Sequence, residues 1–363
     1  MYTQDHFDNT ALLAYAVANG REDELIESGC AEIRKLHGLG QTQVGLWKLP
    51  STSLFEDFNA DLARRLEHDY VKGTVVDVTR NDIDAEGANN VDDNEEGYTL
   101  TLSDGTQITC SAVVLALGPI GKPVVPSKIC NAPKDKLIPW NCMKEHLKPQ
   151  HEVVLVVGGG LTAVQAALAC LSQGKRVYLC SRRPLVERHF DINECWFDKR
   201  SANLHIADFY HLPEEERLAA LREVRGGGSV PPLYMKDVRK WAKKGQLTLV
   251  NNVEPRFVSS TDTGKVLISL DQIGAKELGV EVEFDCVILA TGIKPDCLKN
   301  HLVNKIHENF PIDIVGGFPN ISVDLEWSKN LFVVGALASL NVGPGKHWLF
   351  LRCFVSTFTR SQV

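Results

Sequence analysis

The sequence predicts an α/β fold that contains two copies of one architecture, each with an antiparallel β insertion. Two observations predict the α/β character. HEVVLVVGGGLTAVQAALAC (151–170) reads as an apolar strand, a glycine turn and an alanine-rich helix, and RVYLC (176–180) supplies the next strand. The duplication follows from a repeated pattern: antiparallel strands lead into an apolar strand and a Gly/Pro loop twice, at 98–126 and at 265–296.

The chain before residue 150 is predicted to form helices and then strands. Helical patterns cover 10–18, 23–36 and 51–70, and Ser53 and Glu56 in the last of these have the spacing of a capping box. The following elements are a strand over 71–79, an acidic loop over 80–97, a hairpin over 98–110 and a buried strand with its exit loop over 111–126.

The chain after residue 180 is predicted to return from helices to strands. Helices are expected over 212–228 and 235–245, where Pro213 lies near the start of the first and acidic residues occupy its first turn. Strands are expected over 246–253, 265–272, 280–284, the apolar start of 285–296, and 330–338.

The turn at the centre of the chain fits the pattern G-x-G-x-x-A of a Rossmann-like βαβ unit, with Gly158, Gly160 and Ala163 at the three positions. Gly158 permits the sharp turn, Gly160 lets a pyrophosphate approach the backbone, and Ala163 lets helix and strand pack closely. The phosphates then bind the N–H groups at the helix N-terminus. The predicted pyrophosphate site comprises Gly158, Gly159, Gly160, Leu161, Thr162 and Ala163. The alternative is a tight turn that binds no ligand.

The residues after the second strand indicate which dinucleotide binds. An acidic residue there accepts hydrogen bonds from a ribose 2′-OH, but this chain reads Ser181, Arg182, Arg183. Two arginines suit a 2′-phosphate, so NADPH is favoured over NADH. The alternative is that the arginines are solvated at a strand end.

Composition excludes several kinds of partner. The chain carries 39 Lys and Arg against 46 Asp and Glu, a net charge of −7, with no block of basic residues. This argues against nucleic acid or an anionic membrane surface. The start lacks the apolar segment of a signal peptide, and no convincing membrane span occurs. Ten cysteines without a CxxC pair argue against a zinc site and favour reduced thiols in a cytoplasmic protein.

Several of these motifs together resemble a known family. They are the mid-chain glycine turn, a first strand exit over Leu115 to Gly118, a second exit at Ala290-Thr291-Gly292 with Asp296 beyond it, and NLFVVGALA (330–338). This set resembles the class B flavoprotein monooxygenases, and within them the lysine/ornithine N-hydroxylase-like FAD-dependent oxidoreductases. FDINECWF (190–197) is similar to an Asn-Glu-aromatic stretch of the N-hydroxylating enzymes.

The resemblance implies two nested Rossmann-like dinucleotide-binding domains, with the NADPH-binding domain inside the FAD-type domain. A FAD-type domain would comprise 1–144 and 320–363, and an NADPH-binding domain 145–319. The cofactor-binding residues would include Gly118, Ala290, Thr291, Gly292 and Gly335, and Asn193 and Glu194 would face the substrate. Reduced flavin would activate O₂ for insertion of oxygen into a small amine or another soft nucleophile. No catalytic acid or base is assigned, since this chemistry does not require a strong one.

Three features depart from the family pattern. No glycine fingerprint precedes the first copy of the repeat, Ala336 follows Gly335 where many relatives carry Gly-Asp, and the chain after NVGPG (341–345) lacks the expected helix of short side chains. The outer domain is therefore expected to be incomplete, as in a truncated or spliced product. Its apolar strands, at 113–117 and 331–334, are expected to have edges without a pairing strand. The affinity for FAD is expected to be weakened.

Two other functions remain open. The chain would be a non-catalytic NADP-binding regulator if the flavin site is lost. A pyridine-nucleotide disulfide reductase shares the two-domain plan but needs a redox-active pair of nearby cysteines. The nearest pairs, Cys130/Cys142, Cys170/Cys180 and Cys286/Cys297, have unsuitable spacing and are interpreted as small buried apolar residues.

Overall fold

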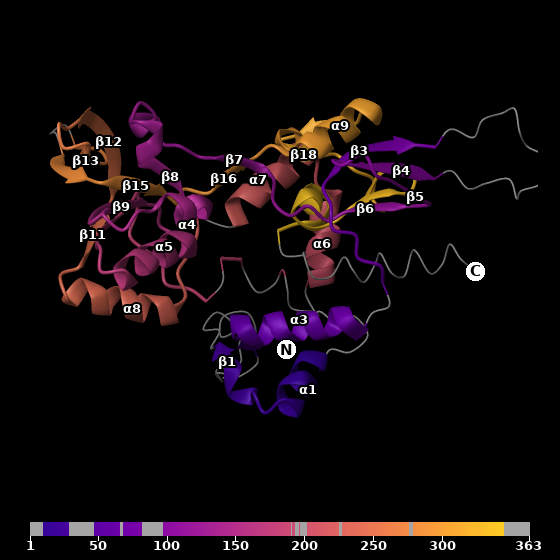
Figure 1. The fold of residues 1–363 in the computed structure, drawn as a ribbon, viewed down its shortest axis with the longest axis horizontal. Helices are drawn as coiled ribbons and strands as arrows, with labels where there is room; N and C mark the ends of the chain where they lie inside the picture. Colours follow the sequence, from indigo (N-terminus) through magenta and orange to yellow (C-terminus); the bar gives the residue numbers. More distant parts are fainter. Residues whose placement is uncertain are drawn as a thin grey trace, which may run out of the picture. The chain divides into compact units, whose positions relative to one another are not determined.

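The structure is a computed structural model that describes residues 10–28, 47–65, 68–81, 97–189, 191–192, 196, 202–224, 227–275 and 279–344. Its contacts divide the chain into two compact units. Unit 1 comprises Met1–Ile120, Glu194–Leu221 and Cys297–Val363, and unit 2 comprises Gly121–Asn193 and Arg222–Asp296. Many of the elements of both are labelled in Figure 1.

Unit 2 is built on a five-stranded parallel sheet. Its order is β11-β10-β9-β15-β8, and every neighbouring pair is parallel. The strands are β8 (Leu137–Pro139), β9 (Val153–Val157), β10 (Arg176–Ser181), β11 (Leu247–Asn251) and β15 (Cys286–Leu289). The predicted βαβ unit is thus present, with β9 and β10 as its strands.

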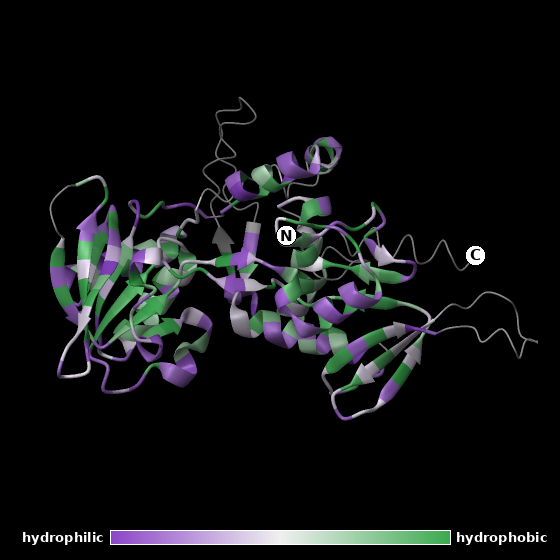
Figure 2. Cartoon of the chain, turned by 90° about the horizontal axis from the view of Figure 1, so that it is seen from above, coloured by the Kyte–Doolittle hydropathy of each residue, from purple (hydrophilic) through white to green (hydrophobic). Residues whose placement is uncertain are grey.

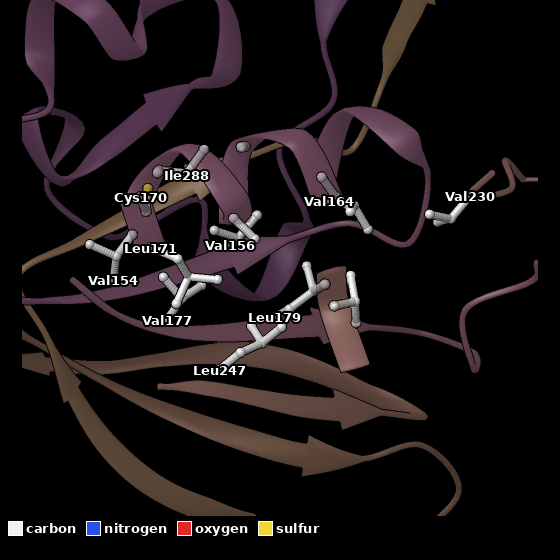
Figure 3. Close-up of a cluster of buried hydrophobic side chains, with 14 of the residues drawn as sticks. Val154, Val156, Val164, Cys170, Leu171, Val177, Leu179, Val230, Leu247 and Ile288 are labelled. Atoms are coloured by element: carbon white, nitrogen blue, oxygen red, sulfur yellow. The ribbon is translucent and has the colours of Figure 1, made fainter. Parts of the chain in front are cut away.

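Both faces of this sheet are covered. Helices α5 (Leu161–Ser172) and α8 (Pro232–Lys243) pack on one face, where they share a core with Val154 and Val156 (Figure 3). The antiparallel strands β12 (Val253–Ser260), β13 (Val266–Gln272) and β14 (Val280–Phe284) cover the other, where Leu155 and Val157 are buried. Burial on both faces explains why β9 reads VVLVV without alternation. In Figure 2 the strands of this sheet are mostly green, the colour of hydrophobic residues.

A buried polar cluster holds the segment that enters β9. Lys175 is 3% exposed, and its Nζ donates to the carbonyls of Lys148 and His151 at 2.9 and 2.8 Å. The carboxylate of Asp285 accepts from the backbone N–H groups of Glu152 and Val153 at 2.9 and 2.8 Å. These bonds give hydrogen-bond partners to backbone groups at the amino end of β9, the central strand of the sheet.

Smaller elements complete unit 2. Strand β7 (Gly121–Pro123) pairs antiparallel with β16 (Ile293–Pro295), and a Cβ on Gly121 would lie 2.3 Å from the carbonyl oxygen of Lys294. Glycine is therefore required where these two strands approach each other. The short helices are η2 (Ser127–Ile129), η3 (Lys134–Lys136), η4 (Trp140–Cys142) and α4 (Met143–His146).

Unit 1 contains two three-stranded sheets that share a core with α9 (His301–Asn309). In the first sheet β3 (Val75–Arg80), β4 (Tyr98–Leu102) and β5 (Gln107–Cys110) are antiparallel. In the second, β20 (Leu331–Val333) lies between β19 (Glu326–Ser328) and the parallel strand β6 (Val113–Leu115). The remaining elements are α6 (Ala202–His211), α7 (Glu214–Val224), η6 (Cys297–Lys299), β17 (Ile314–Val315), β18 (Phe318–Pro319), η7 (Gly335–Ala338) and α10 (Ser339–Val342).

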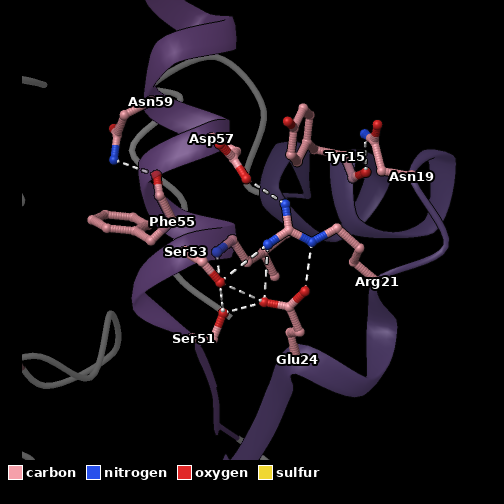
Figure 4. A network of polar contacts seen from close by, with 10 residues as sticks. Tyr15, Asn19, Arg21, Glu24, Ser51, Ser53, Phe55, Asp57 and Asn59 are labelled. Carbon is pink, nitrogen blue, oxygen red and sulfur yellow. Dashed lines mark hydrogen bonds and ion pairs between the residues drawn. The ribbon is translucent and has the colours of Figure 1, made fainter.

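The N-terminal elements form a small core of their own. They are α1 (Ala11–Ala18), η1 (Glu22–Glu24), β1 (Leu25–Ser28), β2 (Trp47–Pro50) and α3 (Thr52–Arg65). Arg21 joins them, because its guanidinium donates to Glu24 in η1 and to Asp57 in α3 (Figure 4). The bond from Arg21, helped by Ser51, lowers the pKa of Glu24 to about 2.

Most predicted elements are confirmed, and four need correction. The strand expected over 330–338 is limited to β20, which ends at Val333, and Gly335–Ala338 form the short helix η7. The helix expected over 23–36 is wrong at its start, since residues 22–28 form η1 and β1 and residues 29–36 lie outside the described part. The helix expected over 51–70 ends at Arg65, and its cap is Ser51, whose hydroxyl accepts from Leu54 N–H at 3.1 Å, rather than Ser53. The helix expected over 212–228 is the shorter α7, preceded by the separate helix α6.

The repeated architecture is confirmed. Strands β3–β5 lead into β6, and β12–β14 lead into β15. The expectation of open edges holds in part. Among the described residues, β6 pairs only with β20, so one of its edges is open, whereas β20 is paired on both sides. None of the helices that the described residues form combines the length and apolar character needed to cross a membrane.

Candidate dinucleotide-binding site

The parallel sheet of unit 2 has a switch point between β9 and β15. From β9 the chain proceeds through α5 to β10 and through α8 to β11, which extends the sheet on one side, while β15 joins β9 on the other side. In open parallel sheets, ligands bind at the carboxyl ends of the two strands where the order reverses. Gly158 follows β9 and Ala290 follows β15, so two of the predicted cofactor residues meet at this point.

The backbone at the switch point is packed too tightly for a side chain on Gly158. A Cβ there would lie 2.4 Å from the Ala290 carbonyl oxygen and 3.0 Å from the Cβ of Ala163, and the φ angle is +150°. The N–H of Gly158 donates to Cys180 O, and the N–H of Ala290 donates to Val157 O, both at 2.9 Å. Gly158 and Ala163 therefore have the local packing roles that the sequence pattern assigns them.

The N-terminus of α5 is available for an anion. Gly160 is its N-cap residue and supplies no side-chain hydrogen bond, so the first N–H groups of this twelve-residue helix are not capped by a side chain. Gly159, Leu161 and Thr162 are half-buried around this turn. A helix N-terminus of this kind suits a pyrophosphate through its N–H groups and the helix dipole.

The three residues after β10 have different environments. Ser181 is 4% exposed, and its hydroxyl lies 2.7 Å from Arg183 O and 3.0 Å from Asn251 Oδ1, so it serves the turn itself. Arg182 is exposed, and no described residue forms a hydrogen bond or ion pair with its side chain. Arg183 donates from Nη2 to the carbonyl of Gly228 at 2.9 Å.

A glycine loop that the sequence reasoning missed lies beside the fingerprint. A Cβ on Gly160 would lie 3.7 Å from the Cα of Gly228, and one on Gly228 would lie 3.2 Å from the Cα of Gly160. The run of glycines at 226–228 was a usable signal, but it was interpreted only as the end of a helix. Asp191 fixes the loop by accepting from both N and Oγ of Ser229 at 2.6 Å. Asn193 and Glu194, the predicted substrate residues, lie outside the described residues.

The exit after β15 is tied to the segment after β7. Thr291 donates from its hydroxyl to the carbonyl of Val124, and Val124 N–H donates to Gly292 O at 3.1 Å. Gly292 has a φ of +82° and open space on the side where a Cβ would lie. Asp296 pairs with Lys122 at 3.1 Å. Two hydrogen bonds and an ion pair thus join the ATG exit and the residues beyond it to the segment around β7.

Unit 1 places its two predicted cofactor glycines together. Gly118 and Gly335 follow β6 and β20, which are parallel neighbours, so both glycines lie at the carboxyl ends of the strands, on the same side of the sheet. Their φ angles are +69° and +73°, and no atom lies within 4 Å of a Cβ built on either. These bare, open backbone positions fit the close approach of a flavin. The described residues of unit 1 contain no glycine-rich strand–turn–helix that could bind a second pyrophosphate.

The cysteines of the candidate pairs differ in burial. Cys170, Cys180, Cys286 and Cys297 are buried, as predicted, but Cys130 is exposed and Cys142 is partly exposed. Burial raises the thiol pKa of Cys170 to about 11 and those of Cys180 and Cys286 to about 12. Thiols of this kind are not nucleophilic at neutral pH. Within the described residues, no cluster of three His, Cys, Asp or Glu could bind a metal.

We therefore expect alkylation of the native protein to be selective. Among the cysteines that the structure describes, iodoacetamide at pH 7 should modify Cys130 first, while Cys170, Cys180 and Cys286 should react only after unfolding, because their thiols are buried and protonated. Peptide mass spectrometry of native and denatured samples measures this order. Modification of Cys170 or Cys286 in the native protein at the rate of Cys130 would contradict the expected burial.

Comparison with known proteins agrees with this architecture. The chain has the fold of the flavoproteins with two dinucleotide-binding domains, which it shares with structures that cover nearly its whole length. Residues 60–200 match the family described as pyridine nucleotide-disulphide oxidoreductase. No curated protein matches the sequence.

Three of the similar structures are N-hydroxylating or related monooxygenases. The ornithine N-hydroxylase of Kutzneria sp. 744, solved with reduced FAD, NADP⁺ and L-ornithine, has a TM-score of 0.69 at 14% identity, and the match covers 100% of this chain and 86% of that one. L-lysine 6-monooxygenase from Pseudomonas syringae has a TM-score of 0.67 at 15% identity, with 100% and 84% covered. Ornithine hydroxylase from Pseudomonas aeruginosa has a TM-score of 0.65 at 14% identity, and the match covers 99% of this chain and 84% of that one.

Proposed function

We propose that the protein is a FAD-dependent, NADPH-using monooxygenase that acts on a small amine or another soft nucleophile. The observation that carries the proposal is the switch point in unit 2, where a G-x-G-x-x-A turn packs against the ATG exit. The shared fold of the ornithine and lysine monooxygenases supports the same function. Bound FAD and NADPH would supply the redox chemistry, and the protein would position them and exclude water.

The residues divide between the two cofactors. NADPH would bind with its pyrophosphate at the N-terminus of α5, over Gly158 to Ala163, and its 2′-phosphate would lie near the arginines after β10. FAD would lie at the carboxyl ends of β6 and β20 in unit 1, where Gly118 and Gly335 have no side chain and open space beside the backbone. We infer that unit 1 is the FAD-type domain, expected from the sequence over 1–144 and 320–363, and that unit 2 is the NADPH-binding domain, expected over 145–319. Asn193 and Glu194 remain the proposed substrate residues.

Reduced cysteines support a cytoplasmic location as part of this proposal. All cysteines among the described residues are free, and four of them are buried. A protein with several free thiols suits a reducing compartment. The proposed substrate is a small molecule, and the negative net charge of −7 disfavours nucleic acid as a partner.

The visible absorption spectrum of the purified protein tests the proposal. The protein is measured before and after incubation with excess FAD and desalting, and a retained flavin spectrum is the expected result. NADPH oxidation is then followed with and without ornithine, lysine and cadaverine, and substrate-dependent oxidation is expected for at least one of these amines. A colourless protein that nevertheless binds NADP⁺ would overturn the monooxygenase function and favour an NADP-binding regulator.

A further inference from the structure

The two arginines after β10 are not equivalent. Arg182 is exposed, and its side chain has no hydrogen-bond or ion-pair partner among the described residues. Arg183 is engaged by the protein itself, since its Nη2 donates to Gly228 O at 2.9 Å. A Cβ on Gly227 would lie 2.8 Å from the same Nη2 atom. Both arginines are exposed, but the guanidinium of Arg183 is held against the backbone of the glycine loop, whereas no described residue holds that of Arg182.

The loop that Arg183 contacts is also fixed at its other end. Val230 N–H donates to Val186 O at 2.8 Å, and Arg188 N–H donates to Val230 O at 3.1 Å. Ser229 is 1% exposed, and both its N and its Oγ donate to Asp191. These bonds join the segment after β10 to residues 228–230. Gly227 and Gly228, with φ angles of +85° and +90°, are the part of the loop that depends on Arg183.

This loop forms a wall beside the predicted pyrophosphate site. The Cα of Gly228 lies 3.7 Å from the position of a Cβ on Gly160, the second glycine of the fingerprint. A shift of the loop would therefore change the space in front of Gly160. The pyrophosphate is common to NADP⁺ and NAD⁺, whereas only NADP⁺ carries the 2′-phosphate, so the two arginines would act on different parts of the ligand.

We propose that Arg182 is the residue that distinguishes NADPH from NADH, and that Arg183 is a positioning residue that holds the 227–229 loop beside Gly160. The proposal rests on the proposed function, because it assumes that the fingerprint binds a dinucleotide. It assigns the discrimination between the two nucleotides to Arg182 alone. Arg183 contributes to the binding of both nucleotides equally, through the loop.

Dissociation constants of the full-length protein for NADP⁺ and NAD⁺ test the division of roles. The variants are Arg182→Ala, Arg183→Ala and Arg183→Lys, and Arg176→Ala is the control, since Arg176 is an exposed arginine at the opposite end of the same strand. Arg182→Ala should weaken NADP⁺ binding about tenfold or more and leave NAD⁺ binding unchanged. Arg183→Ala should weaken the binding of NADP⁺ and of NAD⁺ by a similar factor of about ten. Arg183→Lys should recover most of the affinity that Arg183→Ala loses.

Amide hydrogen exchange provides a second readout that needs no nucleotide. Exchange across residues 227–230 should accelerate in Arg183→Ala and remain unchanged in Arg182→Ala and in the control. The inference is overturned if Arg183→Ala removes the preference for NADP⁺, or if it leaves both binding and exchange unchanged. A wild-type protein that binds neither nucleotide overturns the dinucleotide site itself. If the wild-type protein binds NADP⁺, but Arg182→Ala and Arg183→Ala reduce the preference for NADP⁺ over NAD⁺ equally, only the division of roles between the two arginines is overturned.

Discussion

Replacing Gly158 with alanine is expected to abolish measurable NADP⁺ binding and to lower the free energy of unfolding by about 2–4 kcal/mol. The added Cβ would lie 2.4 Å from the carbonyl oxygen of Ala290, and the residue would keep a φ of +150° that alanine rarely adopts. Relief of this contact moves the turn away from β15 and displaces the N-terminus of α5. Titration with NADP⁺ and urea denaturation measure the two effects.

Gly174→Ala is the matched control for this variant. Gly174 follows the same helix at its other end, with a φ of +78°, and no atom lies within 4 Å of a Cβ built on it. Its replacement should cost only backbone strain, about 1–2 kcal/mol, and leave the NADP⁺ dissociation constant unchanged. Normal NADP⁺ binding by Gly158→Ala would show that the turn is structural and that the ligand-free alternative is correct.

The second large effect is expected at Asp285. Its carboxylate accepts from Glu152 and Val153 N–H at the start of β9 and lies 3.3 Å from Lys265 Nζ, and the residue is 9% exposed. Asp285→Ala leaves both N–H groups without an acceptor, and each such group costs about 1–3 kcal/mol when buried. The free energy of unfolding should therefore fall by about 2–4 kcal/mol at pH 7. Urea denaturation measures the loss.

The effect of Asp285 should depend on pH. Burial raises its pKa, but the bonds from Val153 and Glu152 N–H and the contact with Lys265 lower it more, so the net pKa lies below the usual value. The ionised carboxylate stabilises the folded state above the unfolded pKa of about 4, and this stabilisation is lost as the pH falls through the folded pKa. The stability difference between wild type and Asp285→Asn should narrow below about pH 4.

An exposed ion pair provides the control for this pH series. Glu308 pairs with Lys305 at 2.9 Å on the surface of α9, where solvent screens the charges. Glu308→Gln should leave the unfolding transition unchanged within error at every pH. A constant difference between wild type and Asp285→Asn from pH 7 to pH 3 would show that the charge of Asp285 contributes nothing to stability.

Elements with a strong periodic pattern or a motif could be predicted from the sequence. The strand β9, the helix α5 and the strand β10 were predicted within a few residues because the apolar run, the glycine turn and the alanine-rich helix agree with one another. The two antiparallel insertions were predicted because each pairs strands that are close in the sequence. The helix predicted at residues 25–28 is wrong, since their pairing with 47–50 in β1 and β2 overrides the local helical pattern.

Contacts between distant parts of the chain could not be predicted. The strand β8 contains only Leu137–Pro139, too few residues for a pattern, and it belongs to the sheet because β15 pairs with it. The glycines at 227 and 228 gave no sign of the fingerprint glycine they approach, since about 68 residues separate Gly228 from Gly160. The different environments of Arg182 and Arg183 arise because this loop, which lies beside Gly160, contacts Arg183.

The sequence by itself determined the local chemistry of this protein: a glycine turn suited to a pyrophosphate, two arginines after the next strand, and a repeated strand exit. These depend on residue type and short spacing, which a single chain displays directly. Only the tertiary structure decided which exit meets the turn, that Ser181 and Arg183 are engaged by the protein, and that β6 has an open edge among the described residues. The physical reason is that strand order and loop packing bring together residues far apart in the sequence.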